Sequence, residues 1–142
     1  MSQAVERIVD FFETLTPHSV ARLGEIYADD AYFKDPFNEV RGIPAIRRVF
    51  DHMHVNLHDP HFVVTGSVAD GAQVFLTWEF RFRFKKYSPQ REQVIRGASQ
   101  LWLAADGRIR SHRDYWDAAE ELYERLPVVG ALMRWLKQRA SS

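Results

Sequence analysis

The sequence predicts an α+β fold in which helices cover one face of a curved antiparallel sheet. Apolar residues recur at helical spacing through residue 57, and they alternate with a period of two from His61 to Trp116. The length of 142 residues is typical of one domain, and no linker or internal repeat divides the chain. We therefore expect one domain over residues 1–142, with a core from 4 to 117 and a helical extension over 118–139.

Three helices are expected before the sheet. The second begins at Thr16–Pro17, where threonine caps the helix and proline occupies its first turn, and the third begins at Pro44. Residues 31–42, between them, are expected to be irregular, because Asp35 precedes a proline. The apolar faces of the three helices comprise Val5, Ile8, Phe11, Phe12 and Leu15, then Val20, Leu23, Ile26 and Tyr27, and finally Ile46, Val49, Phe50, Met53 and Leu57.

Four strands follow, over residues 61–69, 74–84, 91–104 and 108–116, with turn signals at Asp70–Gly71 and Asp106–Gly107. The even-numbered residues of the long second strand form a continuous apolar face, which we expect to point toward the helices.

The hairpin after this strand sets which neighbours share the inner face. A turn at residues 87–90 pairs Trp78 with Ser99 and Leu76 with Leu101. In the last strand the large apolar Trp116 selects the inward phase, and His112 and Asp114 have the same phase. The prediction is an apolar cup with few polar groups, a composition typical of a small-molecule site.

The composition argues against several classes of partner. The formal net charge is zero, so nucleic acid or an anionic membrane is not expected to be held by bulk electrostatics. A basic stripe on the outer sheet face (Arg81, Arg83, Lys85 and Arg96) is interrupted by Glu79 and Glu92. Cysteine is absent, which excludes disulfides and thiolate metal sites.

The sequence also predicts a cytoplasmic protein. No apolar run reaches the roughly 18 residues of a membrane span, and the N-terminus lacks the pattern of a signal peptide. The extension, broken at Pro127, ends in a basic amphipathic helix. Such a helix can contact a membrane or a partner, or it can pack on its own domain or across a dimer.

The segment IYADDAYFKDP, followed after a short loop by G-x-x-A-I, resembles the nuclear transport factor 2-like superfamily over about residues 4–117. Relatives include ketosteroid isomerase, SnoaL-like polyketide cyclases and limonene epoxide hydrolase. The resemblance implies a cone: a bent sheet wrapped around the N-terminal helices, also described as a cystatin-like α+β barrel, with a pocket at its open end. It does not imply a reaction, because members share the scaffold without sharing chemistry.

Asp35 resembles in position the catalytic base of ketosteroid isomerase. The alternative is that Asp35 only accepts hydrogen bonds from loop amides. The same matching places Phe11 and Ser99 where the isomerase has the two donors that stabilise its enolate. Phe11 cannot donate and Ser99 is a weaker donor, while losing one oxyanion donor can cost about 100-fold in rate. Strict ketosteroid isomerisation is therefore not expected, and no inward Arg and Asp pair supports the epoxide hydrolase reaction.

Asp114 resembles in position the late-strand aspartate that SnoaL-type cyclases use as acid and base. His112 lies two residues away on the same face, about 7 Å apart at the Cα atoms, so both could reach one ligand. The alternative is a buried ion pair of His112 and Asp114 that Arg110 or Arg113 closes.

A histidine-rich run, DHMHVNLHDPH, raises the possibility of a metal site. Asp51, His54 and His58 share one flank of the third helix, but His52 and His54 point roughly 200° apart and no fourth ligand is evident. We expect a solvated flank and no metal.

These inferences combine into one expected function. A hydrophobic, carbonyl-bearing molecule would bind in the cone, and Asp35, His112 and Asp114 would carry cofactor-independent proton transfer of the isomerase, cyclase or dehydratase type. The residues expected to contact the ligand are Phe11, Leu15, Phe37, Trp78, Phe80, Ser99, Leu101 and Trp116. The alternative is a non-catalytic ligand carrier, or an interaction module that uses the C-terminal helices.

We also expect a homodimer. Phe75 and Trp102 are predicted to lie side by side on the outer sheet face, and paired exposed aromatics suggest burial against a partner. The resemblance implies dimerisation through that convex face.

Overall fold

A computed structural model describes residues 2–85, 89–118 and 139. The extension predicted over 118–139, with its amphipathic helix, lies almost entirely outside these residues. The elements are α1 (Gln3–Glu13), the 3₁₀ helix η1 (Ser19–Glu25), β1 (Tyr27–Lys34), β2 (Glu39–Arg41), α2 (Ile43–Asn56), β3 (Leu57–Asp70), β4 (Gln73–Phe84), β5 (Gln93–Leu103) and β6 (Ile109–Tyr115). None of the helices in this described part is both long and apolar enough to cross a membrane.

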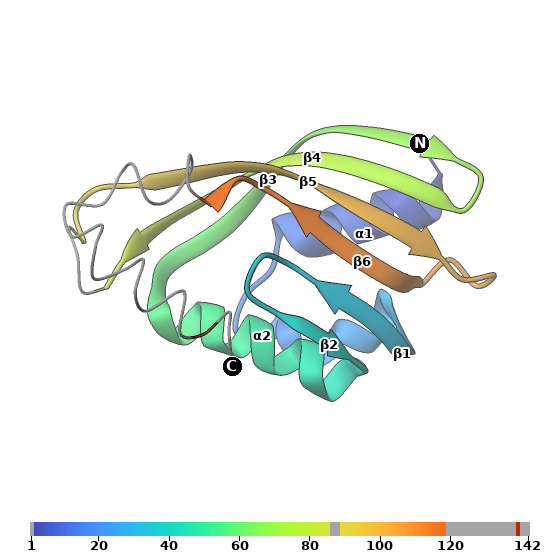
Figure 1. Cartoon of the computed structure of the whole chain (residues 1–142), viewed down its shortest axis with the longest axis horizontal. Coiled ribbons are helices and arrows are strands. Elements are labelled where there is room, and N and C mark those ends of the chain that lie inside the picture. The colour runs from blue at the N-terminus through green and yellow to red at the C-terminus, as the bar shows by residue number, and fades with distance from the viewer. Residues whose placement is uncertain (1, 86–88, 119–138, 140–142) are drawn as a thin grey trace.

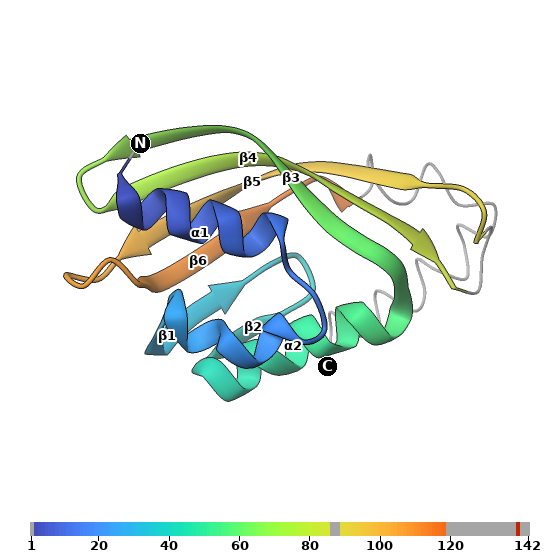
Figure 2. The ribbon, with the colours of Figure 1, turned by 180° about the vertical axis from the view of Figure 1, so that it is seen from behind.

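The strands form one curved, open sheet in the order β2-β1-β6-β5-β4-β3. In Figure 1 the long strand β3 bends strongly, from the end of α2 to the far edge of the sheet. Seen from behind in Figure 2, α1 lies across the concave face, while η1 and α2 lie along its lower edge. This arrangement is the predicted α+β cone, with helices and sheet enclosing a shared core.

The core joins the predicted helical faces to the inner sheet face. Ser2 caps α1 by accepting a hydrogen bond from the amide of Val5, and Pro44 lies in the first turn of α2. The side chains buried in this core include Val5, Ile8, Phe11, Phe12, Leu15, Val20, Leu23, Ile26, Tyr27, Ile46, Phe50, Val74, Leu76, Trp78, Phe82, Ile95, Leu101 and Ile109.

The second predicted helix is shorter than expected. The cap at Thr16 is present, because Thr16 and Ser19 exchange side-chain-to-amide hydrogen bonds, but the turns that follow are 3₁₀ and end at Glu25. Tyr27 begins β1 instead of completing a helix. The carbonyl of Ile26 accepts a hydrogen bond from the amide of Ile109, and this contact ties the chain to β6.

The prediction of an irregular stretch at residues 31–42 was wrong. Residues 27–34 and 39–41 form the antiparallel pair β1–β2. β1 then runs parallel to β6, with Phe33 opposite His112, so one pair in the sheet departs from the antiparallel prediction. A parallel partner about 80 residues away leaves no local signal in the sequence.

The β4–β5 register differs from the prediction by two residues. Trp78 pairs with Gly97, and Leu76 pairs with Ser99. A shift of two leaves every side chain on its predicted face, because strand side chains alternate with a period of two.

The same shift separates the two outer aromatics, since Phe75 faces Gln100 and Trp102 faces Gln73. Phe75 is 42% exposed, and Arg110 stacks on Trp102. The expected homodimer through this face stays a prediction, which light scattering at micromolar concentrations would test.

Candidate functional site

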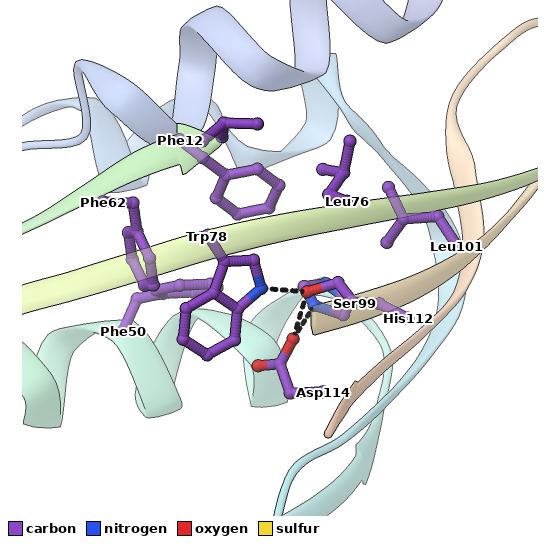
Figure 3. A pocket seen from close by; sticks show the side chains of 10 residues that line it. Phe12, Phe50, Phe62, Leu76, Trp78, Ser99, Leu101, His112 and Asp114 are labelled. Atoms are coloured by element: carbon purple, nitrogen blue, oxygen red, sulfur yellow. Dashed lines mark hydrogen bonds and ion pairs between the residues drawn. The ribbon is translucent and has the colours of Figure 1, made fainter. Parts of the chain in front are cut away.

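A pocket lies between the helices and the concave face of the sheet (Figure 3). The empty space between its lining atoms is about 410 Å³, counting the part open to solvent, and little of that space is clear of the walls by more than the radius of a water molecule. Its lining residues are Phe12, Phe50, Phe62, Val64, Leu76, Trp78, Ser99, Leu101, His112 and Asp114.

One part of the lining is aromatic. Phe12 from α1, Phe50 from α2, Phe62 from β3 and Trp78 from β4 approach one another around the pocket. The ring of Phe12 is 6.2 Å from those of Phe50 and Phe62, and the ring of Phe62 is 5.8 Å from that of Trp78. Phe62 meets both Phe12 and Trp78 edge to face, a favourable geometry that holds these rings in place.

Trp78 is held flat by the strand beside it. A Cβ atom added to Gly97 would lie 2.5 Å from the indole Cη2, so only glycine leaves room for the ring there. The indole Nε1 donates a hydrogen bond to Ser99 Oγ over 2.8 Å. The small residue and the hydroxyl together fix the orientation of the indole.

The polar part of the lining is a single chain of hydrogen bonds, part of which is drawn in Figure 3. From Trp78 the chain continues from Ser99 Oγ to Asp114 Oδ1 over 2.5 Å. His112 Nε2 reaches the same Oδ1 over 2.6 Å, and the His112 Nδ1 lies 2.6 Å from the hydroxyl of Tyr27. Tyr27, at the start of β1, is fully buried.

Donor and acceptor roles fix the direction of this chain. The indole can only donate, so Ser99 accepts from Trp78 and gives its own proton to Asp114. Burial, helped by the charge of Asp114, raises the pKa of Tyr27 well above its ordinary value, so Tyr27 keeps its proton and donates it to His112 Nδ1. When Nδ1 accepts in this way, Nε2 carries a proton and donates it to Asp114 Oδ1. All the donors run toward one carboxylate.

Only one oxygen of that carboxylate is occupied. Both donors converge on Asp114 Oδ1, and Oδ2 has no hydrogen-bond partner among the residues the structure describes. The Asp114 side chain is 17% exposed and lines the pocket, whereas that of His112 is 5% exposed. The two basic residues proposed to close the pair lie elsewhere: Arg110 stacks on Trp102 and Arg113 on Tyr115.

Asp35 has a different environment and does not line this pocket. Its Oδ1 accepts hydrogen bonds from the amides of Phe37 and Asn38, and both of its oxygens accept from the Asn38 side chain. Burial raises the pKa of Asp35; the hydrogen bonds oppose this shift and the charge of Asp114 adds to it. The structure therefore places Asp35 in the loop-holding arrangement that was the alternative to a catalytic base.

The predicted ligand contacts divide into two groups. Five residues of the candidate site line the pocket: Trp78, Ser99, Leu101, His112 and Asp114. The other predicted contacts are not among the lining residues, and their role in binding stays a prediction: Phe11 and Leu15 are buried in the core, Phe37 packs against Trp116 at 5.5 Å, and Phe80 stacks on Phe62 at 4.6 Å.

Sequence reasoning missed half of the lining and one link of the chain. Phe12, Phe50 and Leu76 were identified only as apolar faces, Phe62 and Val64 only as part of a strand, and Tyr27 was assigned to a helix. Ala31 and Phe33 are buried in alternation with Tyr32, a short period-two signal for the strand, but the register shift between Tyr27 and Tyr32 kept that signal from reaching Tyr27.

The histidine-rich run is divided between α2 and β3. In residues 2–85, 89–118 and 139, no three histidines, aspartates or glutamates come together as metal ligands. His54 is not on a solvated flank as expected, because its ring is half-buried and its Nδ1 bonds to the carbonyl of Phe50.

Comparison with known proteins agrees with the geometry. The profile of the SnoaL-like domain family matches residues 8–112, and the chain belongs to this family. No functionally curated protein is a significant sequence match to the chain.

Solved structures share the fold at low identity. A protein with a ketosteroid isomerase-like fold from Catenulispora acidiphila, solved with trimethylamine, has a TM-score of 0.72 at 17% identity, covering 86% of this chain and 91% of its own. A candidate SnoaL-like polyketide cyclase from Shewanella putrefaciens has a TM-score of 0.70 at 20% identity, and the match covers 88% of this chain and 99% of the cyclase. An epoxide hydrolase of M. tuberculosis has a TM-score of 0.68 at 18% identity, and the match covers 95% of this chain and 94% of the hydrolase. Such identities show a common fold and no common reaction.

Proposed function

We propose that the protein binds a small, largely apolar, carbonyl-bearing molecule in the pocket and moves a proton within it, with Asp114 as the base. The observation that carries this proposal is the Asp114 carboxylate, which has one oxygen held by two donors and the other open to an aromatic pocket. Asp35 has no part in the step, since its own loop uses both of its oxygens.

The arrangement suits a general base. Oδ2 would accept a proton from a carbon beside the carbonyl group and return it to another atom of the same molecule, so that no oxidant or reductant is needed. Ser99 and His112 hold the carboxylate in one orientation throughout, and Tyr27 holds His112.

The proposal places the chain among proton-transfer enzymes of the isomerase or cyclase type. A ligand carrier with the same pocket is the alternative, and it differs in one property. A carrier has no need of a base, so its bound molecule would keep its C–H protons.

Deuterium exchange distinguishes the two without knowledge of the natural substrate. Small ketones such as cyclohexanone are incubated with the protein in D₂O, and α-deuteration is followed by NMR. We expect exchange with the wild type, its loss in Asp114→Asn, and its retention in Asp10→Asn, which replaces an exposed carboxylate on α1 in the same way. Exchange that is equal in both variants, or no faster than in buffer, would contradict the proposal.

A further inference from the structure

Among the described residues that line the pocket, no side-chain hydrogen-bond donor is left for a ligand. The Trp78 N–H is given to Ser99, and the Ser99 hydroxyl to Asp114. The Nε2 proton of His112 is also given to Asp114, and the Tyr27 hydroxyl to His112. What the described lining offers a guest is an acceptor, Asp114 Oδ2.

The charged groups of the lining also favour a cationic ligand over an anionic one. No lysine or arginine is among the lining residues in the described part of the chain, and Asp114 is the one acidic side chain there. Asp35 lies near enough for the charge of Asp114 to raise its pKa. An anionic ligand would therefore meet a carboxylate whose basic neighbour, His112, already bonds to it, and this contact is unfavourable in a poorly solvated site.

The aromatic part of the lining has a matching preference. Aromatic rings present a negative face, so a cation near the face of a Trp or Phe ring is attracted to it. Four such rings (Phe12, Phe50, Phe62 and Trp78) surround the space beside Asp114. One carboxylate oxygen within an aromatic wall is an environment that favours a small organic cation.

We infer that the ligand of this pocket carries a protonated amine. The inference rests on the proposed function, which states that a small molecule binds in this pocket. It adds that this molecule is positively charged. It also bears on the missing donors: a neutral ketone should exchange only slowly here, because no side-chain donor of the described lining is free to stabilise the negative charge left when Oδ2 takes a proton from carbon. A positive nitrogen in the substrate itself supplies that stabilisation.

Three compounds of similar shape and different charge test the inference. Isobutylamine is a cation at neutral pH, isobutanol is neutral and isobutyrate is an anion. Binding to the full chain is measured by NMR titration or calorimetry. We expect the cation to bind at least about tenfold more tightly than the alcohol, and the anion to bind more weakly than either.

Two variants locate the effect. Asp114→Asn removes the charge, so it should bring the cation's affinity down to that of the alcohol, while Asp10→Asn should leave both unchanged. Equal binding of cation and alcohol to the wild type, tighter binding of the anion, or no binding of any of the three would overturn the inference. All three of these results are measured on the wild-type protein, so they do not require the variants to fold. If one of these binding results is found but the ketones are still deuterated, the proposed function stands and only the inference about charge fails. If the amine binds but no exchange occurs, the inference stands and only the proposed catalytic step fails.

Discussion

Asp35 and Asp114 are partly buried carboxylates at the same end of the sheet, yet the chain holds them in opposite ways. Asp35 lies in the loop between β1 and β2, and its two oxygens accept hydrogen bonds from that loop's own amides and from Asn38. Asp114 lies on β6, and its neighbours donate to one oxygen only. The capacity of a buried carboxylate for chemistry depends on how far its surroundings occupy its oxygens: each Asp35 oxygen accepts at least one hydrogen bond, whereas Asp114 Oδ2 accepts none from the described residues.

The largest expected contrast between the two acids is in proton transfer. Asp114→Asn should reduce ketone deuteration by about 100-fold or more, because a general base contributes at least that factor. Asp35→Asn should change it less than about threefold, since the amide oxygen can still accept the Phe37 and Asn38 amide protons. NMR exchange rates of both variants, measured beside circular dichroism to confirm folding, test the contrast. Similar losses in the two variants would remove the distinction between them.

Asp35 should matter for the stability of the fold, although it should matter little for proton transfer. Asp35→Ala leaves the amides of Phe37 and Asn38 and the Asn38 side chain without their acceptor, and we expect a loss of about 2 kcal/mol in the free energy of unfolding. Asp106→Ala is the matched control, because Asp106 accepts from the amide of Arg108 in an exposed turn. In urea unfolding, the loss of stability in Asp106→Ala should be clearly smaller than that in Asp35→Ala. A larger loss in the control would mean that burial of the Asp35 loop contributes little.

The hydrogen-bond chain that orients Asp114 can be shortened at its far end. Tyr27→Phe removes the donor to His112 Nδ1 inside the core, and we expect a loss of about 1 kcal/mol in stability. The ring proton should stay on Nε2, because it bonds to the Asp114 carboxylate there, whereas a proton on Nδ1 would have no acceptor in the variant. Proton transfer should therefore change little, since Asp114 and its bond to His112 are intact. Nitrogen NMR shifts of His112 report the tautomer directly, and a move of the proton to Nδ1 would mean that Tyr27 selects the tautomer.

Much of this site could be predicted from strand alternation. The inward phase of Trp78, Ser99, His112 and Asp114 follows from a period of two, and it survived the error of two residues in the β4–β5 register. The direction of the hydrogen bonds could not be predicted, because it depends on Tyr27 reaching His112 across a parallel strand pair.

The aromatic wall shows a second limit of sequence reasoning. Phe11 and Phe12 are adjacent on α1 and both are buried, but only Phe12 lines the pocket. Helical periodicity identifies a buried face, whereas the choice between neighbours on that face depends on where the sheet curves away from the helix. For Phe50 on α2 and Phe62 on β3, the sequence pattern likewise indicated the element but not that these side chains line the pocket.

The smallest expected effect concerns pH. Because the pKa of Asp35 is raised from 3.8, chiefly by burial, the folded protein holds this proton more tightly than the unfolded chain does. The contribution of Asp35 to stability is then fully present below the unfolded pKa and is lost as the pH rises through the folded value. Asp35→Asn does not titrate, so its stability relative to the wild type should increase with pH across that window and then level off. Urea unfolding of the wild type and of Asp35→Asn from about pH 3 to about pH 7 measures the difference between their free energies of unfolding. The other carboxyl groups titrate in both proteins, so their contributions cancel in this difference.

Asp114 gives this measurement its control, because its charge contributes to the raised pKa of Asp35. In an Asp114→Asn background that contribution is absent, so the same comparison should show a narrower window and a smaller difference. A difference that falls with rising pH would mean that hydrogen bonds from the loop outweigh burial and hold the pKa of Asp35 below its ordinary value. A window unchanged by Asp114→Asn would mean instead that the two carboxylates do not interact, and the pocket would then contain the charge of Asp114 alone.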